Sequence, residues 1–261
     1  MSHPQFSIIL ATYNAGKTIE RCISCISNQT FKDFEFIIID GGSTDGTKAI
    51  VDMNKDIVDY YISEPDKGIY DAWNKGVKRT RGEWVMFIGS DDYLLPDALS
   101  SYHKFLMSRD ISKCLYISSK IEIISNSGIK KRIYGWPWSW KEFKYKHMVA
   151  HPGSLHKRLL FERFGPYDTT YKIAGDYELL LRPKENLHAL FFDRIVLKMT
   201  EGGVSSNVKT VIETRKAQIN NKVSSIYKIN FEFLNRIFKF FIKQAALKLH
   251  LNIYLRKEFT R

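Results

Sequence analysis

The sequence contains few cysteines and no long hydrophobic segment. Three cysteines in 261 residues are too few, and odd in number, for a disulfide framework, and this favours a reducing compartment. No charged segment, apolar stretch and small-residue cleavage site precede the first predicted strand, so we expect no secretory signal. No apolar run reaches the ~18 residues that a membrane-spanning helix needs. These absences predict a cytoplasmic protein that does not span a membrane.

Acidic residues are also scarce relative to basic ones, and the imbalance is local. The net charge is +12, and residues 202–261 carry 12 Lys and Arg against 3 Glu (12 − 3 = +9). The first 201 residues therefore carry about +3 (12 − 9). A nucleic-acid-binding enzyme more often has basic residues around its central cleft, so we expect no nucleic-acid partner. The basic tail instead indicates an anionic partner for that segment.

Apolar segments alternate with helical patterns over the first hundred residues. Strands are predicted at 7–11, 34–39, 59–63 and 84–88, and helices at 15–29, 43–51 and 69–78. Buried strands that alternate with helices indicate an α/β fold with a mostly parallel sheet, covered by helices on both faces. Beyond about residue 101 the pattern loosens. Strands are predicted there at 114–118, 120–124 and 189–197, with a helix from 175 and mostly helix from about 208.

Polar residues follow the predicted strands at the points where the strands end. They are Thr12 and Asn14 after the first strand, Asp40 after the second, Glu64 after the third, and Asp91 and Asp92 after the fourth. In an open α/β sheet these positions face one crevice, where such folds bind ligands. Clustered carboxylates repel one another unless a cation lies between them, and oxygen ligands suit Mg²⁺ or Mn²⁺. Such a metal would stabilise the diphosphate that leaves when a sugar–phosphate bond breaks.

Six successive motifs resemble those of the family-2 inverting glycosyltransferases, which have the GT-A fold. They are 7–14 (SIILATYN), 40–46 (DGGSTDG), 64–76 (EPDKGIYDAWNKG), 89–92 (GSDD), 151–153 (HPG) and 174–182 (AGDYELLLR). Their order and spacing are specific, and the likeness covers residues 6 to about 205. The resemblance implies a GT-A domain at 1–205, with a nucleotide-sugar half at about 1–100 and an acceptor half at about 101–205. A basic amphipathic helical tail would follow at 206–261.

The resemblance also implies roles for single residues. Asp40 resembles the aspartate that recognises the base, Asp91 the ribose-side aspartate of the DXD-type motif, and Asp92 the metal ligand. Asp176 resembles the catalytic base that deprotonates the acceptor hydroxyl. The remaining predicted contacts are Thr12, Tyr13 and Asn14 with the nucleotide, and Glu64, Trp73, Trp138 and His151 with acceptor or diphosphate.

Three positions depart from the family pattern. Gly89-Ser90 stands where the family often has an acidic residue, Gly41 replaces a second aspartate, and Trp73 stands where an arginine is common. The first two departures bear on the metal and ribose contacts. The third bears on the identity of the nucleotide.

Structural roles compete with some of these assignments. An aspartate before Tyr-Glu-Leu-Leu-Leu is also typical of a helix N-cap, and Glu178 is the nearest rival of Asp176 as the base. Asp40 would equally satisfy the N-terminal amides of the next helix. The Cys22-x-x-Cys25 spacing is that of a metal or redox pair, but Cys22 falls on the apolar stripe of a helix, so core packing is favoured.

Aromatic residues in the second half leave more than one reading open. Trp136, Trp138 and Trp140 would stack on a sugar ring, fill the core or contact lipid. In the tail, apolar residues share one helical face: Leu234, Ile237, Phe238, Phe241, Ala245 and Leu249. The opposite side carries Arg236, Lys239 and Lys243. Such a helix either packs on the catalytic domain or lies in the plane of an anionic membrane surface.

These expectations combine into one function. We expect an inverting glycosyltransferase that uses Mn²⁺ or Mg²⁺ and moves a hexose or N-acetylhexosamine from a UDP-sugar. The expected acceptor is a saccharide on polyprenyl diphosphate, in the synthesis of a bacterial surface polysaccharide such as O-antigen, at the inner face of the cell membrane. A nucleotidyltransferase would also need acidic residues and a metal, but residues 12–17 match its basic glycine-rich loop poorly. A nucleic-acid-binding protein is suggested only by the net charge.

Overall fold

The computed structural model describes residues 3–125, 127–201 and 208–248. Its strands are β1 (Phe6–Thr12), β2 (Phe34–Asp40), β3 (Tyr60–Ser63), β4 (Trp84–Gly89), β5 (Tyr93–Leu94), β6 (Tyr116–Ile124), β7 (Lys130–Tyr134), β8 (Leu155–Lys157) and β9 (Ala189–Thr200). Its helices are α1 (Ile19–Ser27), α2 (Thr47–Met53), α3 (Ile69–Val77), α4 (Ala98–Met107), α5 (Trp140–Phe143), α6 (Arg158–Phe164), α7 (Gly175–Leu181), α8 (Val208–Asn220) and α9 (Ile226–Lys248). Short 3₁₀ turns lie at Lys55–Ile57 and Lys184–Asn186.

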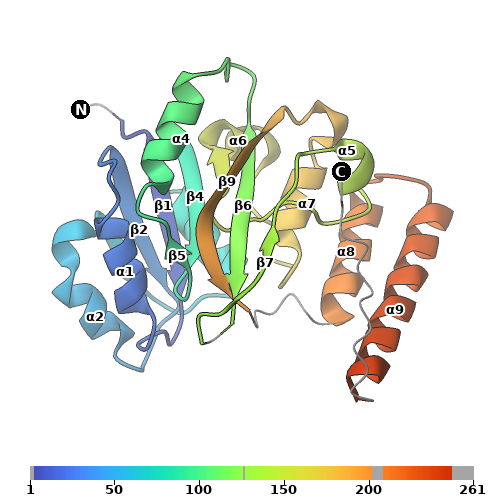
Figure 1. The fold of residues 1–261 in the computed structure, drawn as a ribbon, viewed down its shortest axis with the longest axis horizontal. Helices are drawn as coiled ribbons and strands as arrows, with labels where there is room; N and C mark the ends of the chain where they lie inside the picture. Colours follow the sequence, from blue (N-terminus) through green and yellow to red (C-terminus); the bar gives the residue numbers. More distant parts are fainter. Residues whose placement is uncertain (1–2, 126, 202–207, 249–261) are drawn as a thin grey trace.

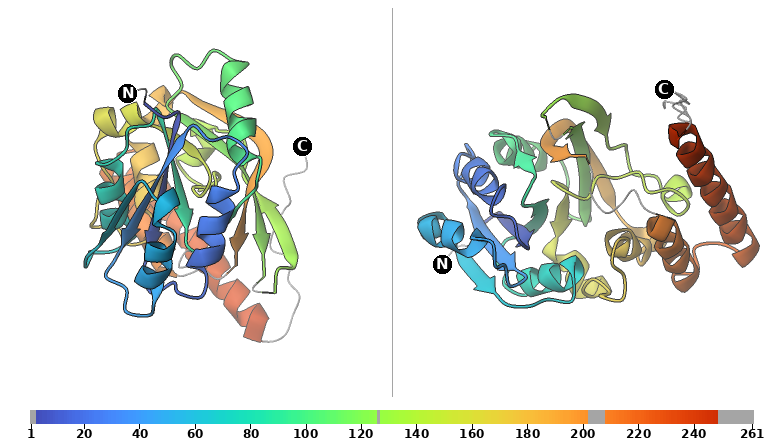
Figure 2. Two further views of the ribbon diagram at one scale, coloured as in Figure 1. Left: turned by 90° about the vertical axis from the view of Figure 1, so that its left-hand side faces the viewer. Right: turned by 90° about the horizontal axis from the view of Figure 1, so that it is seen from below.

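The strands form one curved sheet with helices on both faces, which confirms the predicted α/β fold (Figures 1 and 2). The strand order is β3-β2-β1-β4-β8-β6-β9-β5, and β7 pairs with β6. The first four strands in this order are mutually parallel. Their register sets Thr12 beside Asp40, Asp40 beside Ser63, and Ala11 beside Gly89. The carboxyl ends of these strands therefore meet at one edge of the sheet, as predicted.

The second half of the sheet is mixed, so parallel pairing is less general than the sequence suggests. β6 and β9 are parallel, whereas β8 is antiparallel to both β4 and β6, and β5 and β7 are also antiparallel to their neighbours. The two strands predicted at 114–118 and 120–124 are one strand, β6, in which the register with β9 shifts around Lys120. β7 was not anticipated from the sequence. The short 125–129 connection joins β6 and β7 as an antiparallel hairpin.

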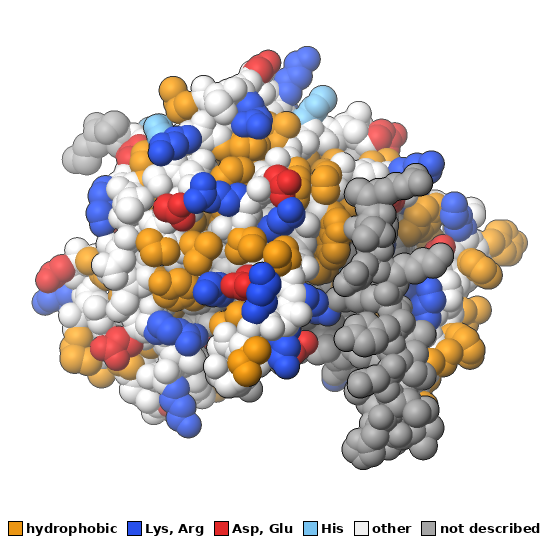
Figure 3. Space-filling view, in the orientation of Figure 1, with side chains coloured by type: hydrophobic (Ala, Val, Ile, Leu, Met, Phe, Trp, Pro, Cys, Tyr) orange, Lys and Arg blue, Asp and Glu red, His pale blue; other side chains and the backbone are white. Residues whose placement is uncertain are grey.

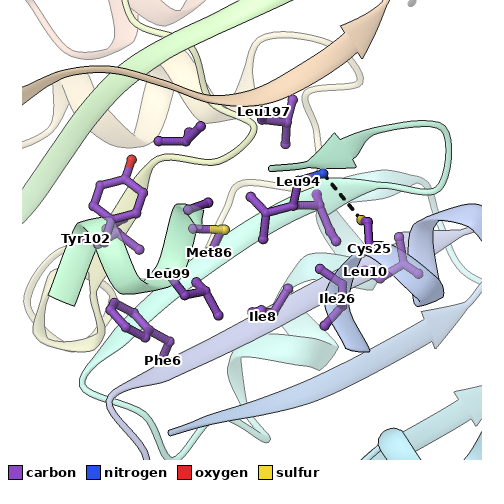
Figure 4. Packing of buried hydrophobic residues seen from close by; sticks show 14 of the residues in the cluster. Phe6, Ile8, Leu10, Cys25, Ile26, Met86, Leu94, Leu99, Tyr102 and Leu197 are labelled. Atoms are coloured by element: carbon purple, nitrogen blue, oxygen red, sulfur yellow. Dashed lines mark hydrogen bonds between the residues drawn. The ribbon is translucent and has the colours of Figure 1, made fainter. Parts of the chain in front are cut away.

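Two hydrophobic cores lie on opposite faces of the sheet. Alternate residues of β1 separate between them: Ile8 and Leu10 join the core that includes α1 and α4, and Ile9 joins the core that includes α3 and α7. A strand that is buried on both faces is therefore apolar along its length. Figure 4 shows the first core, in which the Leu94 N–H donates to the Cys25 sulfur at 3.3 Å. Cys22 and Cys25 are both buried and free, as predicted for core residues.

Helices α8 and α9 lie in the segment where the sequence predicts a helical tail. α8 packs against α7, and α9 packs against α8 (Figure 1). The predicted boundary at residue 205 and the end of the tail at 249–261, including Leu249, fall outside the described residues. Among the described residues, no helix combines the length and apolar composition needed to cross a bilayer.

Candidate functional site

Backbone hydrogen bonds join the strand ends at the predicted ligand edge. The Gly41 N–H donates to the Thr12 carbonyl at 2.9 Å, and the Glu64 N–H donates to the Asp40 carbonyl at 3.0 Å. The predicted contacts on β1, β2 and the segment after β3 are therefore side by side. The Thr12 hydroxyl is buried here and has no hydrogen-bond partner among the described residues. A buried hydroxyl without a partner is available to a ligand.

Asn14 shapes the turn that follows β1. Its backbone has φ +48°, a left-handed conformation that asparagine tolerates better than most residues. Its N–H donates to the Ser43 hydroxyl at 2.7 Å, and its side-chain oxygen accepts the Thr44 N–H at 2.9 Å. The Gly16 N–H donates to the Asp45 carboxylate at 2.9 Å. Asn14 thus uses its side chain to join the turn after β1 to the 41–46 loop.

Asp40 is fully buried and forms several hydrogen bonds within the protein. Its carboxylate accepts the Ser43 N–H and hydroxyl, the Ser63 hydroxyl and, at 3.4 Å, the Tyr61 hydroxyl. The two serine hydroxyls lie at 2.5 Å. A carboxylate has about four acceptor positions, so these donors nearly fill them. Asp40 closes the loop ahead of α2, and its contact with a nucleotide base stays a prediction.

Tyr13 is the exposed aromatic residue at this edge, with 65% of its surface accessible. It lies beside Gly41, where a Cβ would meet the Tyr13 ring at 3.3 Å and the Asp66 carboxylate at 2.7 Å. The carboxylate of Asp66 therefore occupies space that a side chain at position 41 would need. Sequence reasoning singled out Gly41 but not Asp66, because their proximity depends on how the loop after β3 folds back.

Asp91 and Asp92 follow β4 but have different environments. Asp91 is exposed, whereas Asp92 is almost fully buried, and its carboxylate accepts the Gly89 N–H at 2.7 Å. Burial raises the pKa of Asp92 to about 7, and the Asp91 charge adds to this, while the Gly89 N–H and Arg21 oppose it. A Cβ at Gly89 would lie 3.0 Å from the Asp91 carboxylate and 3.2 Å from that of Asp92. A side chain at position 89 would therefore crowd both carboxylates.

The residues of this loop fit a hard divalent cation that completes its coordination elsewhere. Two adjacent carboxylates supply oxygen ligands, and a cation would relieve the burial and repulsion that raise the pKa of Asp92. Within the described residues, no group of three or more His, Cys, Asp or Glu side chains is arranged to hold a metal. Any metal here would therefore take most of its remaining ligands from water or from a bound diphosphate.

Asp176 lies in the first turn of α7 and is held from two sides. The Tyr70 hydroxyl of α3 donates to one carboxylate oxygen at 3.1 Å, and the His147 ring nitrogen Nε2 lies 3.5 Å from the other. Gly175 makes this approach possible, since a Cβ there would lie 2.8 Å from the Tyr70 ring. The residue before the helix is Ala174, so Asp176 is not the N-cap. The N-cap alternative for Asp176 is therefore wrong.

Partners rather than burial determine the charge state of Asp176. Burial raises its pKa, but the nearby His147 and the Tyr177 N–H lower the pKa below its usual range. Asp176 is therefore ionised at neutral pH. The rival Glu178 is buried in an ion pair with Arg182, with a nitrogen–oxygen distance of 2.5 Å, and it accepts the Asn221 side chain at 3.1 Å. This leaves Glu178 a structural role.

The other predicted acceptor or diphosphate contacts, Trp73, His151 and Glu64, are paired within the protein. Trp73 is buried and stacks on His151, with ring centroids 4.5 Å apart. His151 donates to or accepts from the Tyr167 hydroxyl at 3.0 Å, and burial lowers its pKa to about 4, so it is neutral. Glu64 pairs with Lys75 at 2.8 Å. Trp73 and His151 contact protein in this structure, and their contact with acceptor or diphosphate stays a prediction.

The tryptophan-rich loop packs against the second core. Trp136, Trp138 and Trp140 are half-buried against it, and the Trp138 ring lies 4.4 Å from the Phe143 ring. Of the alternatives for this loop, the structure shows core packing. Trp138 keeps part of its surface exposed, so its predicted acceptor contact remains open.

Helix α8 carries a residue that sequence reasoning missed. The Glu213 carboxylate accepts the backbone N–H groups of Lys172, Ile173 and Ala174 at 2.8–3.1 Å. These amides immediately precede α7, so Glu213 fixes the segment that delivers Asp176. His147 was missed for the same reason: neither residue belongs to a motif, and only the fold brings them to Asp176.

The chain is similar to known glycosyltransferases in both sequence and structure. The family model for glycosyl transferase family 2 matches residues 7–148. A PGL/p-HBAD biosynthesis glycosyltransferase of Mycobacterium bovis (strain BCG / Pasteur 1173P2) is 30% identical over 215 residues, covering 80% of this chain and 82% of that protein. The structure of S. aureus TarS 1-349 in complex with UDP-GlcNAc aligns with a TM-score of 0.71 and 21% identity, over 90% of this chain and 73% of that one.

A second solved structure extends the fold comparison. The mannosyltransferase PcManGT from Pyrobaculum calidifontis, in complex with GDP-Man and Mn²⁺, aligns with a TM-score of 0.64 and 17% identity, over 89% of this chain and 70% of that one. The fold is that of a GT-A-type transferase. The chain belongs to glycosyltransferase family 2 and is a glycosyltransferase.

Proposed function

We propose that this glycosyltransferase transfers a hexose or N-acetylhexosamine from a UDP-sugar, with inversion, and that Asp176 is its general base. This proposal is supported by the ionised Asp176, which accepts the Tyr70 hydroxyl and lies 3.5 Å from His147 Nε2, and by the exposed Tyr13 and Asp91 at the strand ends. The assignment of a donor half at about 1–100, an acceptor half at about 101–205 and a tail at 206–261 is part of this proposal.

For the donor, the strand-end edge supplies the nucleotide site. The exposed ring of Tyr13 can stack on the base, and the Thr12 hydroxyl, which has no partner among the described residues, can form a hydrogen bond with the nucleotide. The carboxylate of Asp91 is exposed and can accept a hydrogen bond from the ribose. Asn14 and Asp40 contribute by holding the loops that frame the base. The choice of UDP is supported by the TarS neighbour, which was solved with UDP-GlcNAc.

For the metal, Asp92 with Asp91 would hold Mn²⁺ or Mg²⁺ together with the diphosphate of the donor. When bound, the cation supplies positive charge to the departing nucleoside diphosphate. This proposal is supported by the raised pKa of Asp92 and by the Mn²⁺ complex of the mannosyltransferase neighbour. Gly89 leaves room for the two carboxylates to converge.

For the acceptor, Asp176 takes the proton of the attacking hydroxyl. The acceptor oxygen bonds to the anomeric carbon from the face opposite the diphosphate, and the sugar–phosphate bond breaks with its electron pair leaving on the diphosphate. One displacement inverts the anomeric configuration, so an α-linked donor yields a β-linked product. Positioned general bases contribute about 10²–10⁴-fold to such steps.

The proposed membrane contact is made by α9. Five large side chains on it, at three- and four-residue spacing, are exposed: Tyr227, Phe231, Leu234, Phe238 and Phe241. Figure 3 shows hydrophobic side chains along the right-hand edge, where Figure 1 places α9. Exposed basic residues on α9 and at the end of α8 include Lys222, Lys228 and Lys239. An apolar stripe beside basic residues fits the surface of an anionic membrane.

The predicted faces of α9 are only partly observed. Leu234, Phe238 and Phe241 share the exposed stripe, whereas Ile237 is half-buried. Arg236 is also half-buried rather than solvated, and burial lowers its pKa. We propose peripheral attachment through this stripe, with a lipid-linked saccharide of the bacterial surface-polysaccharide type as acceptor.

Calorimetry with UDP, GDP, CDP and dTDP, each with and without Mn²⁺, tests the donor proposal. Of the four nucleotides, we expect only UDP to bind, and we expect its binding to require Mn²⁺. Binding of none of the four would overturn the donor assignment. Flotation with vesicles tests the membrane proposal. The chain is expected to rise with anionic vesicles and not with zwitterionic ones, and Phe231→Ser with Phe238→Ser is expected to abolish this.

A further inference from the structure

The carboxylate of Asp176 contacts two side chains from different parts of the chain. Tyr70 comes from α3 and donates to one oxygen at 3.1 Å. His147 comes from the segment between α5 and β8, and its Nε2 lies 3.5 Å from the other oxygen. The Asp176 side chain is 15% exposed and that of His147 is 37% exposed. His147 is therefore the more exposed of the two side chains, and the Asp176 carboxylate is largely shielded from solvent.

The His147 ring is held in place by aromatic neighbours. Its centroid lies 5.5 Å from the ring of Tyr177 and 6.1 Å from that of Phe143. The backbone carbonyl of His147 accepts the Tyr134 hydroxyl at 2.9 Å. The Tyr177 hydroxyl in turn donates to the Phe143 carbonyl at 3.0 Å. These contacts place the ring next to Asp176.

The other titratable groups that face Asp176 have little charge to offer. Tyr70 and Tyr167 are buried, and burial raises the pKa of each well above its usual value, so both are neutral. Tyr116 is likewise neutral, and His151 is neutral because burial lowers its pKa to about 4. His147 remains as the half-exposed partner, whose Nε2 lies 3.5 Å from the carboxylate and which carries charge when protonated.

We propose that His147 is a positioning residue for the general base: its Nε2–H donates to Asp176 and holds the carboxylate ionised and oriented towards the acceptor hydroxyl. This rests on the proposed role of Asp176. In the step, the hydroxyl proton moves to Asp176 as the carbon–oxygen bond forms, and His147 keeps its own proton. Because Nε2 is committed to Asp176, His147 does not itself take the acceptor proton.

The test compares His147→Ala, His147→Gln and a control, His188→Ala, at an exposed histidine next to the start of β9. For His147→Ala we expect kcat to fall about 10- to 100-fold, because a small displacement of a catalytic group has effects of this size. The KM for the donor should change less than about twofold. The acid limb of the kcat–pH profile should move to higher pH, since losing His147 raises the pKa of Asp176.

The conservative variant separates positioning from packing. His147→Gln retains an N–H donor and should recover part of kcat, but it lacks a charge and should keep the shifted acid limb. If His147→Ala fails to fold, Tyr70→Phe removes only the second hydroxyl donor and should also shift the acid limb upwards. An unchanged kcat and pH profile in His147→Ala, or an unchanged pH profile in His147→Gln where the former is unfolded, overturns the proposal.

The same experiment distinguishes this inference from the proposed function. Asp176→Asn is measured in parallel. If Asp176→Asn abolishes activity while the His147 variants behave like His188→Ala, the positioning role is wrong and the base assignment stands. If Asp176→Asn keeps wild-type kcat, the base assignment itself is wrong.

Discussion

The proposed donor half and the proposed acceptor half each contain a largely buried aspartate, and the pKa values of these two aspartates are shifted in opposite directions. Asp92 has mainly the Gly89 N–H as a partner, and burial raises its pKa to about 7. Asp176 is opposed by burial as well, but His147 and its other partners lower its pKa. The difference shows that partners, rather than depth alone, decide which buried carboxylate is charged.

This contrast has a functional meaning. A carboxylate that is disfavoured as an anion is stabilised by a cation, which suits a metal ligand. A carboxylate that is already ionised and oriented can accept a proton at neutral pH, although a low pKa makes it a weaker base. The two environments thus suit the two roles proposed for Asp92 and Asp176.

The largest expected effect separates the tasks directly. Asp176→Asn should lower kcat by about 10²–10⁴-fold, because it removes the proton acceptor, and should leave the affinity for UDP nearly unchanged. Steady-state kinetics and calorimetry on the same preparation measure both. Asp52→Asn, at an exposed position on α2, is the matched control. A parallel loss of UDP affinity would show that Asp176 belongs to the donor site.

Substitution of the proposed metal ligand, Asp92, should weaken binding of the donor nucleotide. Asp92→Asn should remove the metal-dependent part of UDP binding and reduce activity about 10²- to 10³-fold, since a metal contributes several kcal/mol at the transition state. Titration of UDP with and without Mn²⁺ measures this. Undiminished metal-dependent binding in Asp92→Asn would remove Asp92 from the metal site.

A substitution in α8 should weaken only the acceptor half. Glu213→Ala leaves the amides of residues 172–174 without their acceptor and should destabilise the protein by about 1–3 kcal/mol. Because the segment delivers Asp176, kcat should fall while UDP binding is retained. Denaturant unfolding and kinetics test this against Glu162→Ala, an exposed glutamate on α6. Equal losses in the two variants would refute a specific role for Glu213.

The smallest expected effect is the pH dependence of stability. The raised pKa of Asp92 means that its contribution is most favourable below the unfolded-state pKa and is lost as pH rises towards about 7. For Asp176 the lowered pKa gives the opposite sign: its contribution is present above the unfolded-state pKa and is lost at more acidic pH. At pH 7.5 without metal, Asp92→Asn should therefore not destabilise the protein, whereas Asp176→Asn should.

Thermal unfolding at about pH 3, 5 and 7.5, with and without Mn²⁺, measures these signs, because the unfolded-state pKa of an aspartate is about 3.9. Mn²⁺ should raise the melting temperature of the wild type more at the higher pH, and should have little effect on Asp92→Asn. If Asp92→Asn destabilises as much as Asp176→Asn at pH 7.5, the contrast between the two carboxylates is wrong.

The donor half was largely predictable from the sequence because each of its buried strands is an apolar run that ends at a polar turn. β1, β2 and β4 follow that pattern closely. The acceptor half was harder. Ser118 and Ser119 are fully buried in the middle of β6 but resemble a break between two strands. β7 is a mostly exposed strand, with a Lys-Lys-Arg start that lacks the usual strand alternation.

The site divides in the same way. Asp40, Asp92 and Asp176 belong to motifs with recognisable spacing, so the sequence indicates them. Their partners do not: Tyr70 lies 106 residues from Asp176, and Glu213 lies about 40 residues from the amides it binds. Such contacts depend on how the elements pack. The environments that set the two pKa shifts therefore had to come from the structure.

The most direct measurement is a titration of UDP into the wild type, Asp92→Asn and Asp176→Asn in the presence of Mn²⁺. We expect the wild type and Asp176→Asn to bind UDP with similar affinity, and we expect Asp92→Asn not to bind UDP. Equal binding by all three proteins, or loss of binding in Asp176→Asn alone, would contradict it.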